Sequence, residues 1–423
     1  MSTSPSASPA PGNWLQRSAS GIGDTFIVYR DPNYLWYWIA SFSYYVGFFT
    51  DIFAIGYLAY EMTGSAVMLG AVVTSQGLPM AGLSVIGGTL ADRVSKRTLL
   101  VWSQLVLAIV GGMLFLLLVT DAIEFWHLIV LSFAKGVAVG FSLPARLSFV
   151  SEVVPQEQFS RAYGLYYVAL NSMRIGGPGF GGIIAGSFGV QGAYFVIAIA
   201  HLVGLVTLLF VRPQIKKEPR KPTPLSQDLM EIYYLARRTP TIMVLMGAEL
   251  GLVFFAFSAI NLMPMFTKTE FAVGATGLGT LLALQGVGGL LGSFATAVGG
   301  GVQRKPLMLL LAGIALGGVL ILFANSPVYG AALALAVPLG FVGAAYTTYN
   351  STLFQISAPP EMRGRAMSLY LLGQALQPVG LIPISAAADA VGFRLAVSVA
   401  GAVLIVYMTA VLVLFPTFRR QRV

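Results

Sequence analysis

Long apolar segments recur along this chain, and they constrain its fold more than any other feature of the sequence. A helix that spans a bilayer needs about 20 largely apolar residues, and twelve segments reach that length. Only 10% of the 423 residues are charged, against roughly 25% in soluble domains. We therefore predict an all-α polytopic membrane protein. The predicted spans are 34–60, 64–90, 98–119, 124–148, 162–187, 190–211, 241–266, 274–299, 306–324, 328–356, 366–388 and 392–415.

The twelve spans fall into two groups of six, and the two groups share a sequence repeat. A single shift of 204 positions aligns seven identical residues, which indicates a chain built from two similar halves. We expect an N-terminal tail (1–33), a first six-helix bundle (34–211), a connector (212–240), a second six-helix bundle (241–415) and a C-terminal tail (416–423). The identical pairs are Pro155 and Pro359, Glu157 and Glu361, Arg161 and Arg365, Ala162 and Ala366, Leu165 and Leu369, Tyr166 and Tyr370, and Gly176 and Gly380.

Basic residues predict the orientation, because loops rich in Lys and Arg stay in the cytoplasm. With the N-terminus inside, 21 of the 25 basic residues fall in or beside the tails, the connector and the cytoplasmic loops, and the exceptions are Lys135, Arg174, Lys268 and Arg394. We therefore predict that both termini are cytoplasmic. Residues 225–238 of the connector have the pattern of an amphipathic helix on the inner membrane surface. The first span is expected to act as the insertion signal.

Several function classes require motifs that this sequence does not contain. There is no nucleotide-binding loop of the form GxxxxGK[ST], which argues against direct use of ATP. There is no cysteine, no HExxH and no GxSxG, so we expect neither a thiolate metal site nor an intramembrane enzyme. The net charge of +9 fits basic cytoplasmic loops better than nucleic-acid binding. No cofactor is predicted.

The loop after the second span reads GGTLADRVSKR. It resembles the loop signature of the major facilitator superfamily, a glycine, an Asp-Arg pair and a basic cluster, with Ser95 in place of the usual glycine. The resemblance implies the major facilitator fold and a conformational latch at this loop, whose carboxylate holds cations or helix N-termini of a neighbouring helix. The alternative is a basic loop that only fixes topology. The matching residues are Gly88, Asp92, Arg93, Lys96 and Arg97.

The fifth span combines a dense glycine cluster with a proline, a composition that membrane helices use for close packing. It resembles the antiporter signature of the same superfamily, although Met173 stands where a glycine is usual and Ile382 replaces the proline in the second half. With its flanking residues, this stretch resembles the drug and siderophore exporter branch, which includes the enterobactin exporter and macrolide efflux pumps. The residues in register are Gly164, Gly177, Pro178, Gly181 and Gly182.

Four ionisable residues stand out in the interior of the predicted spans, where a charge is costly and a functional site is expected by default: Asp51, Lys135, Arg174 and Glu249. Three of them lie on spans 1, 4 and 7, which line the central cavity in the superfamily. Asp51 and Lys135 are predicted at one depth and in contact, because each lies about ten residues from the outer end of its span. We assign proton coupling to Asp51 with Lys135 as its charge partner; the alternative is a static ion pair or a solvated cavity wall.

Glu249 and Arg174 have two interpretations each. Glu249 is either a second proton site or a site for a cationic substrate, with a solvated carboxylate as the alternative. Arg174 is either a gate residue between the halves or a structural partner of Asp51 or of a backbone carbonyl. His127 and His201 are assigned to packing or hydrogen bonding rather than to proton relay.

Polar side chains on several spans are candidates for a substrate cavity. Tyr44 and Asp51 are seven residues apart and therefore share one helix face. Aromatic and amide groups suit an amphipathic organic ligand, and the alternative for each is a hydrogen bond between helices. The candidates are Tyr44, Gln76, Asn171, Asn261, Gln285, Tyr346, Tyr349, Asn350, Gln374 and Gln377.

These features together predict a secondary active transporter that exports an amphipathic small molecule, a drug or a siderophore, by alternating access with protons as the coupling ion. A lipid or lysolipid translocator or an importer on the same fold is the alternative; a non-transporting membrane sensor is disfavoured by the short tails. The resemblance implies a monomer in the cytoplasmic (inner) membrane of a bacterium, with no nucleic-acid partner. The substrate itself is not predicted, because a few side chains change pocket chemistry in one fold.

Overall fold

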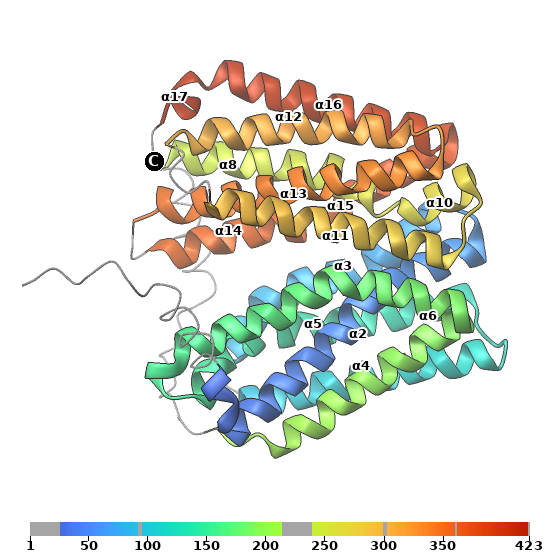
Figure 1. The fold of residues 1–423 in the computed structure, drawn as a ribbon, viewed down its shortest axis with the longest axis vertical. Coiled ribbons are helices and arrows are strands. Elements are labelled where there is room, and N and C mark those ends of the chain that lie inside the picture. Colours follow the sequence, from blue (N-terminus) through green and yellow to red (C-terminus); the bar gives the residue numbers. More distant parts are fainter. Residues whose placement is uncertain (1–25, 92–94, 214–238, 299–302, 360–361, 422–423) are drawn as a thin grey trace, which may run out of the picture.

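The computed structural model describes residues 26–91, 95–213, 239–298, 303–359 and 362–421, and within these ranges the chain is helical without β-strands (Figure 1). Each half of the chain forms one helical bundle. The first contains η1 (Phe26–Arg30), α2 (Pro32–Thr63), α3 (Ala66–Ala91), α4 (Lys96–Val119), α5 (Phe125–Val153), η2 (Gln156–Gln158) and α6 (Phe159–Phe210). The second contains α8 (Pro240–Gly251), η3 (Leu252–Phe257), α9 (Ser258–Ile260), α10 (Met263–Phe271), α11 (Ala275–Val298), α12 (Lys305–Ala324), α13 (Tyr329–Ser357), α14 (Arg363–Ala375), α15 (Gln377–Val391), α16 (Phe393–Leu414) and α17 (Pro416–Arg419).

The predicted set of twelve spans is confirmed, with differences in continuity. Eleven helical segments in the described residues are long and apolar enough to cross a membrane, and one of them includes α6, which contains both the fifth and the sixth span because the chain turns at Gly189 (φ 73°, ψ 171°). The seventh span is divided among α8, the π-helical η3, α9 and α10, and the eleventh between α14 and α15. Residues 214–238, which include the predicted amphipathic helix, lie outside the described residues.

Local signals fix both ends of α2, the helix that carries Asp51. Asp31 caps its start, since the Asp31 carboxylate accepts a hydrogen bond of 2.9 Å from the Asn33 amide, and Pro32 occupies the first turn. Gly64 ends the helix in the left-handed conformation (φ 63°), which glycine adopts without strain. These two ends set the depth at which Asp51 lies along the bundle.

The sequence repeat is also a structural repeat. Helices α5 and α13 each contain 29 residues, and both their first and their last residues are 204 positions apart. Arg146 in α5 therefore occupies the same helical turn as Asn350 in α13. Equivalent helices of the two bundles thus present different side chains at matching positions.

The two bundles contact each other through α6 with α11 and through α3 with α15. The closest approach lies between Gly182 and Gly279, where a Cβ built on Gly182 would lie 2.4 Å from the Gly279 Cα. Small residues permit such contacts between membrane helices. The bundles converge toward this end of the molecule and their ribbons separate toward the opposite end, where the C-terminus lies (Figure 1).

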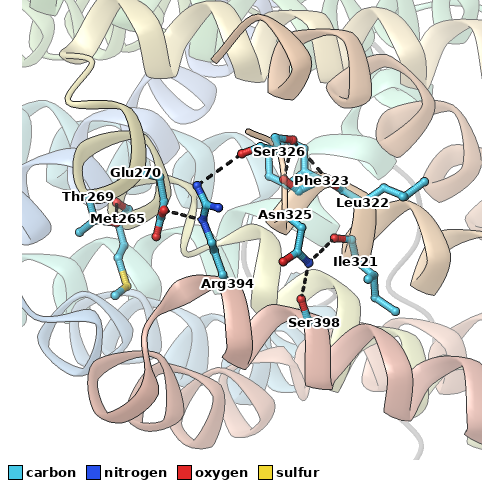
Figure 2. A network of polar contacts seen from close by, with 10 residues as sticks. All are labelled: Met265, Thr269, Glu270, Ile321, Leu322, Phe323, Asn325, Ser326, Arg394 and Ser398. Atoms are coloured by element: carbon cyan, nitrogen blue, oxygen red, sulfur yellow. Dashed lines mark hydrogen bonds and ion pairs between the residues drawn. The ribbon is translucent and has the colours of Figure 1, made fainter. Parts of the chain in front are cut away.

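A polar network at the converging end lies entirely within the second bundle (Figure 2). The Arg394 guanidinium donates to the Glu270 carboxylate at 2.6 Å and to the Ser326 carbonyl at 3.4 Å. Asn325 donates to the Ser398 hydroxyl at 2.8 Å. These bonds tie α10 and the end of α12 to the start of α16, so this part of the bundle is held together without the other bundle.

Candidate functional site

A buried ion pair joins two helices of the first bundle. The Lys135 ammonium on α5 donates to both carboxylate oxygens of Asp51 on α2, each at 2.8 Å. The two side chains are only 5% and 6% exposed. This is the contact that their predicted depths indicated. Such a pair is sensitive to charge, because neutralising one partner leaves the other as an uncompensated buried ion.

A water-sized cavity of about 10 Å³ adjoins the ion pair and is lined by Asp51, Lys135, Gln76 and His201 among mainly apolar neighbours. A buried water molecule requires roughly this volume and several polar partners. His201 is fixed on its other side by a contact of 3.1 Å between its Nδ1 and the Gln104 Oε1. The arrangement gives the ion pair polar neighbours inside the bundle.

The second bundle contains an acidic centre of a different kind. Glu249 on α8 is fully buried, and its carboxylate accepts hydrogen bonds from Asn350 on α13 and, at 3.1 Å, from Gln374 on α14. Gln374 also donates to the Tyr370 hydroxyl at 2.8 Å. Within the described ranges no Lys or Arg forms an ion pair with Glu249. Its carboxylate is therefore held by amides alone, and Tyr346 is buried beside it.

Arg174 does not take the structural role that the sequence left open. Within the part of the chain that the structure describes, it neither pairs with Asp51, whose partner is Lys135, nor donates to a backbone carbonyl. It is an exposed residue of α6 whose charge acts on the Tyr370 hydroxyl of α14, in the other bundle. Arg174 therefore lies near α14 of the second bundle.

The remaining cavity candidates divide into three groups. Asn171 and Asn261 donate to carbonyls of their own helices at 2.9 and 2.8 Å, and Gln377 donates to the Phe257 carbonyl at 3.3 Å. Tyr44 and Tyr346 are buried inside their bundles, 1% and 0% exposed. Gln285 and Tyr349 are partly exposed.

The loop motif acts within one bundle where it is described. Lys96 forms an ion pair with Glu152, and Arg97 donates to the carbonyls of Leu208 and Leu209 at 3.3 and 2.6 Å. These contacts join the start of α4 to the ends of α5 and α6, and a cation suits a helix C-terminus. Gly88 lies in α3. Asp92 and Arg93, the centre of the predicted latch, lie outside the described residues.

The glycine motif packs α6 against two helices at once. A Cβ on Gly177 would lie 2.6 Å from the Phe49 Cβ, and one on Gly181 would lie 3.0 Å from the Phe53 ring, so this face meets α2. Gly182 meets Gly279 of α11. Pro178 is buried in the same segment, whereas Gly164 has open space beside it. The motif therefore brings α6 close to its own bundle and to the other bundle.

A carboxylate that the sequence analysis did not select connects the bundles. Asp389, near the end of α15, accepts hydrogen bonds from the Ser65 hydroxyl at 2.5 Å and from the amides of Ala66 and Val67 at 2.6 and 2.9 Å. It thus caps α3 from the other bundle. A second contact, Lys268 to Glu61 at 3.1 Å, lies between α10 and α2. Asp389 lies one residue beyond the predicted eleventh span, and that position at a helix end was the available signal.

A second residue that the sequence analysis passed over is Arg146. The predicted fourth span ends at 148, which puts Arg146 at the membrane edge, but α5 continues to Val153 and encloses it. Arg146 is 0% exposed, and its guanidinium lies 3.8 Å from the centre of the Tyr44 ring. An arginine seven residues before the end of a long apolar helix was the signal for a buried charge.

Known proteins resemble this chain along most of its length. A family model described as Major Facilitator Superfamily matches residues 37–379. Multidrug efflux pump Tap of Mycolicibacterium fortuitum is 24% identical over 360 residues, covering 81% of this chain and 86% of that protein. Macrolide efflux protein A of Streptococcus pyogenes is 23% identical over 353 residues, covering 80% of this chain and 85% of that protein.

Two solved structures share the fold at low identity. A bacterial homolog of the human lysosomal transporter Spinster, in an inward-facing and unoccupied conformation, has a TM-score of 0.70 and 16% identity and covers 93% of this chain and 99% of that one. The peptide transporter POT in complex with sulfate has a TM-score of 0.74 and 13% identity, with coverages of 93% and 96%. At these identities the likeness concerns the fold.

Proposed function

This chain belongs to the major facilitator superfamily of membrane transporters, and we propose that it exports an amphipathic small molecule by alternating access in exchange for protons. The observation that carries the proposal is the buried Asp51–Lys135 ion pair beside a water-sized cavity. Export is supported by the efflux proteins among the relatives, which are 23–24% identical to this chain.

In the proposed cycle, Asp51 takes up the transported proton. Protonation removes one charge of the ion pair and leaves Lys135 without its buried counterion, which is unfavourable in a medium of low polarity. The first bundle is then driven toward a conformation in which water or cargo reaches Lys135. Release of the proton on the other side re-forms the pair and completes the exchange. Glu249 is proposed as the second proton site, since its amide partners can hydrogen-bond to either form of the carboxyl group.

Alternating access is proposed to use the contacts between the bundles. Gly182 with Gly279 and Asp389 with the start of α3 close one end of the molecule. On the topology that the basic residues predict, with both termini cytoplasmic, this closed end faces outward. We assign the protein to the cytoplasmic membrane of a bacterium, as a monomer, because one chain supplies both bundles.

The proposal is tested in proteoliposomes that contain the purified chain and a trapped pH-sensitive dye. With erythromycin as the probe, wild-type protein is expected to move protons when the drug is added and to accumulate drug against an imposed pH gradient. Asp51→Asn is expected to abolish pH-driven flux, while Asp121→Asn, on the exposed turn after α4, serves as the control and retains it. Unchanged pH-driven flux in Asp51→Asn would remove Asp51 from the coupling site.

One observation favours a lipid translocator as the second candidate. A groove of about 320 Å³ lies between α11, α12 and α13, with Leu311, Phe341 and Tyr349 among its mainly apolar lining. An acyl chain suits such a surface. Movement of fluorescent phospholipid between leaflets, without erythromycin transport, would replace drug export by this function.

A further inference from the structure

We propose that Arg146 is the centre of a binding site for a small monovalent anionic group inside the first bundle. Arg146 has the largest side chain among the most deeply buried described residues, at 0% exposure. None of the residues that the structure describes accepts a hydrogen bond from its Nε or from either terminal nitrogen. An arginine stays protonated in proteins, so a full positive charge lies in the bundle without an acceptor for these donors.

The neighbours of Arg146 do not compensate this charge. The Tyr44 ring lies 3.8 Å below the guanidinium, a cation–π contact that stabilises the charge but accepts none of its in-plane N–H groups. The Tyr37 hydroxyl donates to the Arg146 backbone carbonyl, and the hydroxyls of Tyr45 and Tyr166 hydrogen-bond to each other. These three phenols are thus engaged elsewhere, and the Tyr44 hydroxyl, which has no hydrogen-bond partner among the described residues, does not bond to Arg146 either, so the guanidinium edge is left for another acceptor.

The structural repeat shows which group accepts the corresponding hydrogen bond in the second bundle. At the matching turn of α13, Asn350 donates to the carboxylate of Glu249. Tyr166 and Tyr370, also 204 positions apart, lie beside the two centres. The second bundle therefore supplies both a donor and an anion, whereas the first supplies only a donor.

No acid of the first bundle is available to Arg146 among the described residues nearby. The Asp51 carboxylate is held by Lys135 through both oxygens, and Glu152 is paired with Lys96. A buried charge is strongly unfavourable unless it is paired. The described residues therefore leave the place of this anion to a bound ligand.

The chemistry of the site defines its ligand. A guanidinium binds carboxylates and other monovalent anions through its planar set of N–H groups, and the enclosing tyrosines restrict the ligand to a small group. Two sources supply such a group, a free inorganic anion or the carboxylate of a cargo molecule. The proposal follows from the fold and does not require that the protein exchange protons, so a failed transport assay leaves it standing.

The test uses the full-length protein in lipid nanodiscs, with sodium chloride and sodium acetate as probes and sodium gluconate at equal ionic strength as the bulky control. Chloride or acetate is expected to raise the melting temperature saturably, by about 2 °C or more, relative to gluconate. Arg146→Gln is expected to lose this rise. Arg304→Gln removes an exposed arginine at the start of α12 and is expected to keep it.

Equilibrium dialysis with radiolabelled chloride and acetate supplies a direct readout that needs no variant. Saturable binding of both probes assigns the site to free anions, and binding of acetate alone assigns it to a carboxylate of the cargo. Absence of saturable binding of either probe to the wild-type protein overturns the proposal, even where Arg146→Gln does not fold. Equal binding by wild type and Arg146→Gln overturns it as well.

Discussion

Replacing Asp389 by alanine is expected to shift the protein away from the conformation described above. The Asp389 carboxylate accepts hydrogen bonds of 2.5, 2.6 and 2.9 Å from the start of α3, in the other bundle. A side chain that caps a helix in this way typically contributes about 0.5–2 kcal/mol, and a negative charge at a helix N-terminus adds about 0.3–1 kcal/mol. Because Asp389 is exposed, we expect a loss of about 1–2 kcal/mol, which changes the ratio of conformations by a factor of about 5–30.

Distances between spin labels measure this shift directly. The sequence contains no cysteine, so Glu157→Cys with Gln355→Cys introduces two labelling sites into an otherwise unmodified chain. Both positions are exposed: Glu157 lies in η2, just after the end of α5, and Gln355 lies in the last turn of α13, the equivalent helix of the other bundle. When the two bundles approach each other at the end of the molecule that carries the labels, the distance between the labels is expected to shorten. In Asp389→Ala the short-distance population is therefore expected to rise, and in Asp389→Asn, which keeps one acceptor oxygen, it is expected to rise less.

The matched control is Glu270→Ala. Glu270 is also an acid at the converging end, but its partner Arg394 belongs to the same bundle (Figure 2). Loss of this bond is expected to lower the melting temperature without changing the distance between the labels. An unchanged distance distribution in Asp389→Ala, or an equal change in Glu270→Ala, would refute the reasoning that contacts between bundles set the conformational ratio.

Three further predictions concern the bundle interiors and their contact. Lys135→Met is expected to lower the free energy of unfolding by about 3–5 kcal/mol, because it leaves the Asp51 carboxylate buried without a counterion. Adding Asp51→Asn to this variant is expected to restore most of the stability but not the pH-driven flux. Thermal unfolding measures the stability, and the proteoliposome assay measures the flux. Gly182→Val is expected to separate the bundles, because even a Cβ would lie 2.4 Å from the Gly279 Cα, and the label distance reports it. Glu249→Gln is expected to retain the fold and reduce proton-coupled flux, and unchanged flux would contradict its proposed role.

The span pattern was predictable because each membrane helix is encoded locally. The apolar length of a segment is visible in the sequence, and so is a turn residue such as Gly189, which separates the fifth and sixth spans. Helix ends were less predictable, since α5 continues through polar residues to Val153. That extension of five residues changes Arg146 from an expected edge residue into a fully buried one.

The site was predictable only where the depth of each residue along its helix was sufficient to place it. The Asp51–Lys135 contact follows from the rise per residue along two helices of one bundle. The contact of Asp389 with α3 joins residues more than 320 positions apart, and it depends on how the two bundles lie relative to each other. No local pattern contains that information, because the neighbours of Asp389 along the chain do not set how one bundle packs against the other.

Polar contacts within the bundles and between them belong to different parts of the proposed cycle. The Asp51–Lys135 pair lies inside one bundle, whereas Asp389 joins both. If each bundle moves as a rigid body, the contacts between bundles break while those within them persist. A change of charge at Asp51 must then reach the interface through packing, and α6 provides this connection because Gly177 contacts α2 and Gly182 contacts α11. Gly177→Ala is therefore expected to weaken the dependence of the label distance on pH while preserving the Asp51–Lys135 pair, and an unaltered pH dependence would exclude this route.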